Sequence, residues 1–223
     1  AKNTDPVRTP LNTEYCNEKI KDVYHQLFDE ALQRYNQKQK RADRKIENYY
    51  EKIRSGKQEK PFHEIIIQVG NCDNMNAKTS DGELAERILD EYYQDFQKRN
   101  PCLKVFSAHL HMDEATPHLH IDFVPFTTKS KRGLDTRVSL KQALANQGFV
   151  GNSKHETEWS LWVESEMEAL SKVMERYGVE WEQKGTHEKH LSVYDYEKKM
   201  RSQEVEKLTA ESGKLNIKVE ELT

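Results

Sequence analysis

The sequence predicts an α+β protein built around an antiparallel β-sheet. Residues 109–123 are the first observation, because polar and apolar residues alternate there along two short runs joined by a polar, proline-bearing turn. Residues 62–69 form a further run that is rich in β-branched residues. Apolar residues at helical spacing occupy most of the remaining chain. Alternation indicates strands and a spacing of three to four residues indicates helices, so both are present in separate stretches.

The first part of the chain is expected to be mainly helical. Residues 1–13 hold two prolines among Asn, Thr and Asp, which favours a loop. From about residue 14 to residue 54 apolar residues recur at helical spacing, with a break near 37–42. Ser55 and Gly56 are expected to end this helical region.

The middle of the chain is expected to hold the sheet and its covering helices. The predicted strands span residues 62–69, 105–111 and 118–125. The predicted helices span residues 83–99, 139–147 and 157–177. Ser80 is expected to cap the first of these helices, with Glu83 at the capping-box position. Residues 179–181 are a candidate edge strand.

The C-terminal part is rich in Lys and Glu from about residue 194 onward. Apolar residues repeat there at heptad spacing: Val205, Leu208, Leu215, Val219 and Leu222. This stripe predicts the start of a coiled coil, which would join two copies of the chain in a homodimer; a helix that packs back on the domain is the alternative. We therefore divide the chain into a domain over 1–190 and a C-terminal helix over 191–223.

The charge pattern limits the classes of function. The net charge is −3, so no overall basic field indicates a nucleic-acid-binding protein. The charges are unevenly distributed, because residues 33–60 hold ten Lys and Arg against four Asp and Glu, whereas residues 156–182 hold eight Glu. A local basic excess of this kind can mark a surface that binds a polyanion.

The cysteines and the termini bear on the cellular location. Cys16, Cys72 and Cys102 are isolated and form no disulfide framework, which favours a reducing cytoplasm. No apolar run reaches membrane length and no signal peptide is visible. The chain begins with Ala and opens on a polar stretch, so we expect an excised part of a longer protein.

The predicted hairpin concentrates metal-binding side chains. Neighbouring side chains of a strand point to opposite faces, so His109 and His111 share one face, as do His118 and His120 on the next strand. Neutral imidazoles that pack together need a donor for every acceptor nitrogen, and a divalent cation satisfies several at once. A single histidine on a strand is usually structural or solvated, but four with nearby carboxylates predict a metal site.

Two motifs carry a resemblance to a known family. The segment His111-x-Asp-Glu-x-x-x-His-x-His120 resembles the metal motif of the mobilisation relaxases of the Mob/Pre (MobV) family, also known as plasmid recombination enzymes. The opening segment, Asn3-Thr-Asp-Pro-Val-Arg-Thr-Pro-Leu-Asn12, resembles a second stretch of this family. The two motifs frame residues 3–125 in the family's order, and beyond them the resemblance is general.

The resemblance implies an HUH endonuclease fold, an antiparallel sheet with helices packed on one face. It implies a divalent metal ion, Mn²⁺ or Mg²⁺, bound by His111, His118 and His120. It assigns Glu114 as a further ligand or a partner of the site, and Arg8 as a catalytic-site residue that helps to position the DNA strand. The implied activity is the nicking and rejoining of single-stranded DNA at an origin of transfer (oriT), for plasmid mobilisation in conjugation.

The nucleophile is not identified by the sequence. Members of the family carry a His-Asn-x-Arg motif upstream of the opening stretch, and this chain has none. Either the nucleophile precedes Ala1 or the chain uses a tyrosine, for which Tyr15, Tyr49 and Tyr50 are candidates, although tyrosines at helical spacing usually belong to a core. We expect residues 1–223 by themselves to bind metal and DNA and to cleave poorly.

Two basic segments are expected to contact DNA phosphates. The first is the loop over 127–136 and its flank, with Lys129, Lys131, Arg132 and Arg137; it follows the metal-bearing strand and is expected near one end of the site. The second lies in the helical region and provides Arg41, Arg44 and Lys45. Solvated surface is the alternative interpretation of both.

Two other functions fit part of the pattern. Histidine clusters with carboxylates also serve metal-dependent hydrolases, although the helical His-Glu-x-x-His motif is absent. A non-catalytic DNA-binding or replication-control module that retains the metal site is the second alternative, and the missing nucleophile motif favours it. A covalent protein–DNA adduct, a free 5′-phosphate or intact bound DNA would distinguish the three functions.

Overall fold

The computed structural model describes residues 4–180, 201–202, 205 and 208–209. The chain divides into two compact units, residues 1–181 and 182–223. In the second unit the described residues are helical, and Val205 and Leu208 are exposed. The rest of the predicted coiled coil lies outside the described residues. No helix in the described ranges is both long enough and apolar enough to cross a membrane.

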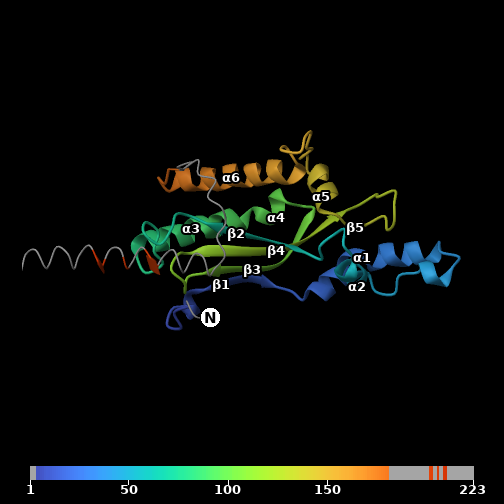
Figure 1. Ribbon diagram of the computed structural model, residues 1–223, viewed down its shortest axis with the longest axis horizontal. Helices are drawn as coiled ribbons and strands as arrows, with labels where there is room; N and C mark the ends of the chain where they lie inside the picture. Colours follow the sequence, from blue (N-terminus) through green and yellow to red (C-terminus); the bar gives the residue numbers. More distant parts are fainter. Residues whose placement is uncertain (1–3, 181–200, 203–204, 206–207, 210–223) are drawn as a thin grey trace, which may run out of the picture. The chain divides into compact units, whose positions relative to one another are not determined.

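The first unit holds a β-sheet and its covering helices (Figure 1). In chain order its elements are η1 (Thr9–Leu11), β1 (Thr13–Asn17), α1 (Ile20–Gln37), η2 (Ala42–Arg44), α2 (Tyr49–Ser55), β2 (His63–Gln68), α3 (Ser80–Gln94), α4 (Phe96–Arg99), β3 (Leu103–His111), β4 (His118–Thr127), β5 (Arg137–Val138), α5 (Leu140–Asn146) and α6 (Glu158–Arg176).

The strands pair in the order β1-β3-β4-β2, and the short β5 also pairs with β4. All four pairings are antiparallel, which confirms the predicted sheet. The β3–β4 hairpin lies at the centre, and its register places His111 opposite His118 and His109 opposite His120. The four histidines of the hairpin therefore lie on the same face of the sheet.

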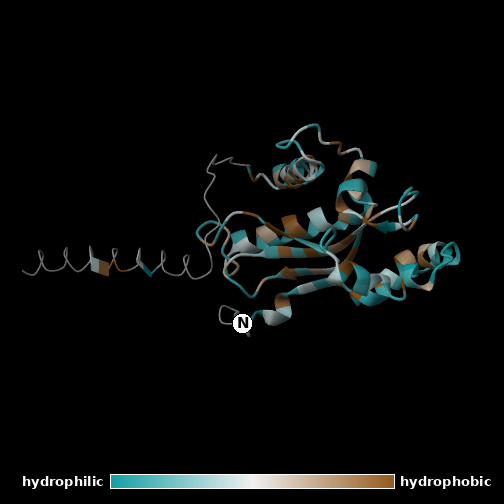
Figure 2. Cartoon of the chain, turned by 45° about the vertical axis from the view of Figure 1, so that its right-hand side comes forward, coloured by the Kyte–Doolittle hydropathy of each residue, from teal (hydrophilic) through white to brown (hydrophobic). Residues whose placement is uncertain are grey.

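Strand alternation separates a buried face from an open one. Leu110 of β3 and Leu119, Ile121 and Phe123 of β4 are fully buried in a core that α3, α4, α5 and α6 complete. Figure 2 shows hydrophobic residues along the strands and along the helices that cover them. The residues of opposite parity, the histidines among them, lie on the other face. Helices on one face of the sheet were predicted, and α3 to α6 confirm this.

The far end of the histidine-bearing face is covered by α1 and α2, which the sequence did not indicate. These helices form a second core around Phe106 and Val124. Val124 has the parity of His118 and His120, and a β-bulge between Val105 and Ser107 brings Phe106 to the same side. The open part of this face is thereby limited to the end that carries the histidines.

The predicted start of the helical region was wrong. Thr13–Asn17 form β1, because Thr and Tyr favour extended backbone and Tyr15 and Cys16 pack against the main core. The helix begins only at Ile20. The predicted break is confirmed, since α1 ends at Gln37 and α2 begins at Tyr49.

Three further details differ from the sequence-based expectation. The cap of α3 is Thr79 rather than Ser80, and its hydroxyl accepts from the amide of Gly82. Val179 and Glu180 form no strand, and Trp181 lies outside the described residues; Val179 packs against the main core instead. The two-residue strand β5 was missed because two residues carry no periodicity.

Candidate metal centre

Three imidazole rings form a nearly equilateral triangle on the open face of the hairpin. The ring centres of His111 and His118 are 5.2 Å apart, those of His111 and His120 are 5.2 Å apart, and those of His118 and His120 are 5.0 Å apart. The ring of His109 lies 6.4 Å from that of His111, farther than any side of the triangle. The hairpin thus brings together the three histidines that the family motif singled out.

Two of the three rings are fixed through Nδ1. The Nδ1 atom of His120 lies 2.7 Å from Oε1 of Glu64, and Nδ1 of His118 lies 2.9 Å from the carbonyl oxygen of Thr116. Carbonyl oxygens and ionised carboxylates only accept, so each ring carries its proton on Nδ1. The lone pair of Nε2 is then free on each ring, which is the arrangement in which histidine binds a metal ion.

The third ring faces a buried carboxylate. Nδ1 of His111 lies 3.6 Å from Oδ1 of Asp113, which is too far for a hydrogen bond. Asp113 is 5% exposed, and this Oδ1 has no hydrogen-bond partner. Burial raises the pKa of Asp113, but hydrogen bonds from Asn12 and Thr9 outweigh it and keep the pKa below the usual value. An ionised, unsatisfied oxygen therefore faces His111.

The protonation state of His111 suits a metal ligand. Burial lowers its pKa, and His118 and His120 lower it further, while Asp113 and Glu114 oppose this in part. The net direction is downward, so the ring is neutral near pH 7. Only a neutral imidazole can donate a lone pair to a cation.

The spacing of the rings fits one shared cation. With metal–nitrogen bonds of about 2.1 Å, the centres of two imidazoles on one ion lie about 4.5 to 5.2 Å apart. The ring nitrogens do not converge on a single point, since no group of three His, Cys, Asp or Glu in the described part of the chain forms a ready-made metal site. The distances between the ring centres are therefore the feature of the triangle that matches a shared cation.

The opening motif and the metal motif meet in space. Arg8 donates from Nε to the carbonyl of Met112 over 2.9 Å and from its terminal nitrogen to the carbonyl of Ala77. Asn12 accepts from the amide of Met112 over 2.7 Å, and Thr9 donates to Asp113 over 2.9 Å. Residues about a hundred positions apart thus clamp the strand end that carries His111.

Sequence and structure comparisons agree with this arrangement. The family model Mob_Pre, plasmid recombination enzyme, matches residues 1–198. The chain belongs to the plasmid recombination enzyme family. A search of curated proteins gave no match.

The solved structures that this family member resembles are relaxase domains. One is the MobM relaxase domain (MOBV; Mob_Pre) bound to 22 nucleotides of plasmid pMV158 oriT DNA, an Mn-bound crystal structure at pH 5.5; it is 21% identical, with a TM-score of 0.50, over 89% of this chain and 85% of that chain. Another is the same domain with 23 nucleotides at pH 6.5, 21% identical, with a TM-score of 0.47, over 90% and 86%. The first likeness confirms the relaxase fold.

Two predicted site residues of this plasmid recombination enzyme belong to the surroundings of the strand end that carries His111. Glu114 is half-buried on the turn that follows β3, and its charge acts on His111. Arg8 is occupied by two backbone carbonyls, so its contacts are with the metal-bearing turn. Sequence reasoning missed Glu64, because only the register of β2 with β4 brings it to His120. The alternation of side chains along β2 was the one signal in the sequence that could have indicated Glu64.

The candidate tyrosines are engaged in packing. The hydroxyl of Tyr15 donates to Asp90 over 2.8 Å, and its ring stacks on Tyr93 of α3. Tyr49 is buried and accepts from the amide of Val138 over 3.1 Å. Tyr50 packs edge-on against Tyr24. These contacts favour structural roles, and no nucleophile is assigned.

The basic loop is farther from the histidines than expected. It follows the C-terminal end of β4, whereas His118 and His120 stand at the beginning, and seven residues of strand separate His120 from Thr127 by about 23 Å. The expectation that the loop adjoins the metal site was therefore wrong. Lys129, Lys131 and Arg132 are exposed.

The other basic candidates differ in whether their side chains are exposed or engaged in contacts. Arg137 is half-buried and donates to Ser130 over 2.9 Å. Arg41 pairs with Asp43, with its Nε 2.9 Å from the carboxylate. Arg44, the last residue of η2, and Lys45, which follows it, are exposed.

Proposed function

We propose that this protein is a DNA relaxase that nicks one strand at an origin of transfer and rejoins it, using a divalent cation held by His111, His118 and His120. The observation that carries the proposal is the triangle of imidazoles on an open sheet face, with Nδ1 of two rings engaged by acceptors. Family membership supports it. So does the shared fold of a relaxase domain that was crystallised with Mn and oriT DNA.

The chemistry of the site suits phosphodiester cleavage. A divalent cation bound there would supply positive charge to a phosphate that becomes more negative as it reacts. The three ligands are neutral imidazoles, so they would not compensate the positive charge of the cation that they bind. One layer outside, Glu64 fixes the ring of His120, and the carboxylates of Glu64 and Asp113 balance the charge of the centre as a whole.

We assign roles to the two further residues from their surroundings. Arg8 ties the opening segment to the end of β3 through Met112 and Ala77, so it positions His111 through the backbone. Glu114 stands beside the triangle as a further ligand or as a proton acceptor for the attacking group. Three free cysteines support a cytoplasmic location.

Plasmid nicking tests the function. The protein is incubated with a supercoiled plasmid that carries oriT, in Mn²⁺, Mg²⁺ or EDTA. We expect cation-dependent conversion to open circles with a covalent protein–DNA adduct, and at least a hundredfold slower conversion for His118→Ala and His120→Ala. The control is Trp159→Phe, on the helix-covered side. Products with free 5′-phosphates and no adduct would instead indicate a hydrolase.

The non-catalytic binding module is distinguished in the same experiment. It would retain oriT DNA in a gel shift and leave it intact. Residues 1–223 contain the three ligands, so Mn²⁺ binding is measured on this chain, whereas nicking is measured on this chain and on the product of its full reading frame. A chain that binds neither Mn²⁺ nor oriT DNA contradicts the proposal.

A further inference from the structure

We propose that Glu64 is the residue that positions His120 for metal binding, and that the length of its side chain is required as well as its charge. The inference rests on the proposed function, since it concerns the same metal centre. It adds a residue of β2, which lies between the two family motifs in the sequence and belongs to neither.

The contact fixes both the proton and the orientation of the ring. Oε1 of Glu64 lies 2.7 Å from Nδ1 of His120, and the carboxylate can only accept. The proton is therefore held on Nδ1, and the lone pair stays on Nε2. The ring centre of His120 is 5.0 Å from that of His118 and 5.2 Å from that of His111, so this ring completes the triangle. Without Glu64 the ring can rotate and exchange tautomers.

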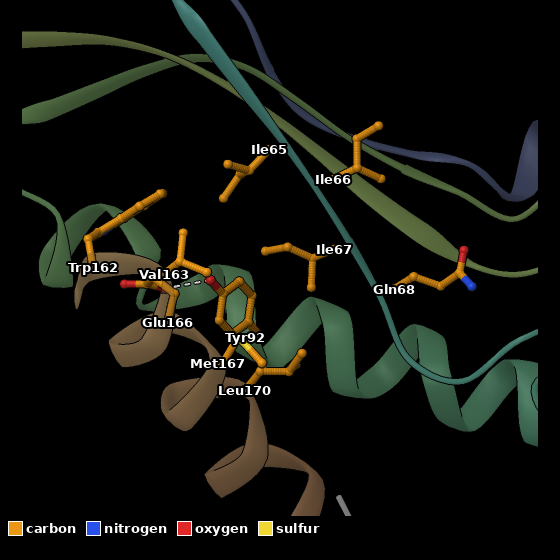
Figure 3. A pocket seen from close by; sticks show the side chains of 10 residues that line it. All are labelled: Ile65, Ile66, Ile67, Gln68, Tyr92, Trp162, Val163, Glu166, Met167 and Leu170. Carbon is orange, nitrogen blue, oxygen red and sulfur yellow. Dashed lines mark hydrogen bonds between the residues drawn. The ribbon is translucent and has the colours of Figure 1, made fainter. Parts of the chain in front are cut away.

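The reach of the side chain follows from the strand register. Ile66 lies directly opposite His120, whereas Glu64 lies opposite Asp122. Glu64 thus contacts His120 diagonally across the two strands, a separation of about 7 to 8 Å that only a long side chain can bridge. Ile66 has no acceptor and is 59% exposed. Figure 3 shows Ile65 and Ile67 directed toward the helices and Ile66 directed away from them. Glu64 has the parity of Ile66.

The position of Glu64 is unfavourable for stability alone. Two carboxylates directly opposite each other destabilise a pair of strands, and Glu64 is opposite Asp122. A Gln or Thr at this position would avoid the repulsion. The packing of β2 does not require a carboxylate at this position, whereas the contact with His120 uses one.

Glu14 provides a matched control on the same face. It is an exposed carboxylate on β1 opposite His109, with Oε2 3.8 Å from Nδ1 of that ring. His109 lies outside the triangle. A change at Glu14 therefore alters the charge of the face equally without touching a proposed ligand.

The test measures Mn²⁺ affinity in the absence of DNA, from the electron paramagnetic resonance signal of free Mn²⁺. We expect Glu64→Ala and Glu64→Asp to weaken binding about 10- to 100-fold, as for other partners of metal-bound histidines. Glu64→Gln should lose less, because its amide oxygen still accepts the Nδ1 proton at the same reach. Glu14→Ala should bind like the unaltered protein. Circular dichroism melting checks the fold, and if Glu64→Ala does not fold, Glu64→Asp provides the same test, because it keeps the charge and shortens the reach.

A second readout follows the ring itself. In the metal-free protein, nitrogen NMR should show His120 protonated at Nδ1, with a mixture of tautomers in Glu64→Ala. Unchanged Mn²⁺ affinity or an unchanged tautomer in Glu64→Ala overturns the inference, as does an equal loss in Glu14→Ala. If this chain binds Mn²⁺ but neither it nor the product of its full reading frame nicks DNA, the proposed function fails while the role of Glu64 stands. If DNA is nicked but Glu64→Ala binds Mn²⁺ with unchanged affinity, the proposed function stands and the role of Glu64 fails.

Discussion

Single buried side chains hold distant elements together on the helix side of the sheet. The carboxylate of Glu166 on α6 accepts from the hydroxyl of Tyr92, from Arg99 over 3.0 Å and from Asn100 over 2.9 Å (Figure 3 shows the Tyr92 contact). Trp162 donates to the same Asn100 over 2.7 Å. One carboxylate thus satisfies donors from α3, α4 and the turn after α4.

Removing this carboxylate should be strongly destabilising. Glu166→Ala leaves the charge of Arg99 and the hydroxyl of Tyr92 without their acceptor, and breaking such a buried pair costs about 3 kcal/mol. Urea unfolding followed by tryptophan fluorescence measures the free energy of unfolding. The control is Glu168→Ala on the same helix, whose exposed pair with Lys172 should contribute little to stability. Equal losses in the two variants would contradict the network.

At the level of residues, the three proposed ligands were predictable and their partners were not. Alternation within one hairpin places His111, His118 and His120 on one face together with His109, and the resemblance to the family motif selects these three; both signals are local. Glu64 is 56 residues from His120, and Thr9 is 104 residues from Asp113, so both contacts depend on register and folding. The orienting carbonyl of Thr116 has no side-chain signal at all.

Among the elements, the basic loop after β4 is fastened to α1 by one ion pair. Arg34 donates to both carboxylate oxygens of Asp135, over 2.9 and 2.8 Å. The guanidinium hydrogen bond, with its charge, lowers the pKa of Asp135 below the usual value. Because both partners are partly exposed, the pair should matter for the loop more than for global stability.

Loosening this attachment should expose the loop to protease. Asp135→Asn is expected to accelerate trypsin cleavage after Lys129, Lys131 or Arg132 several-fold at pH 7. Asp43→Asn, which breaks the exposed pair with Arg41, serves as the control and should leave cleavage of the loop unchanged. An unaltered rate in Asp135→Asn would show that other contacts hold the loop.

The same pair has a defined pH dependence. A carboxyl whose folded pKa is lowered contributes stability above its unfolded pKa of about 3.9 and loses it as the pH falls through the folded value. Attachment of the loop should therefore be complete at neutral pH and disappear only in acid. Asp135 in the unaltered protein should titrate at lower pH than in Arg34→Met, as followed by carboxyl NMR.

The elements were predicted correctly where a periodic pattern extends over many residues and were missed where it covers only a few. The helices α5 and α6 and the hairpin strands lie within two residues of their predicted bounds, whereas the helix predicted over 83–99 is divided at Asp95 into α3 and α4. β1 was absorbed into a predicted helix because five residues cannot establish a period against the strong helical pattern that follows. The position of α1 and α2 over Phe106 and Val124 depends on a bulge, which alternation alone does not reveal.

For the first unit as a whole, we propose that a DNA strand runs from the open face to the basic loop. The histidines occupy one end of β4, and the loop leaves the other end about 23 Å away, beyond the region that α1 and α2 cover. At about 3.4 Å per stacked nucleotide, this distance corresponds to about seven nucleotides. A strand held at the metal by one phosphate would reach the loop only if it extends that far.

Length and salt together test this path. Lys131→Ala/Arg132→Ala removes two exposed cations, so for oligonucleotides that extend beyond about seven nucleotides toward the loop, the slope of log affinity against log salt should fall by about 1.4. Shorter oligonucleotides should bind both proteins equally, because they never reach the loop. Fluorescence anisotropy at several salt concentrations measures the affinity and its salt dependence for each length.

The control variant Lys141→Ala/Lys172→Ala removes the same charge from the helix-covered side and should leave the slope unchanged for every length. Equal effects on short and long oligonucleotides would mean that the loop acts through the general field of the protein, and no effect on either would remove it from the path.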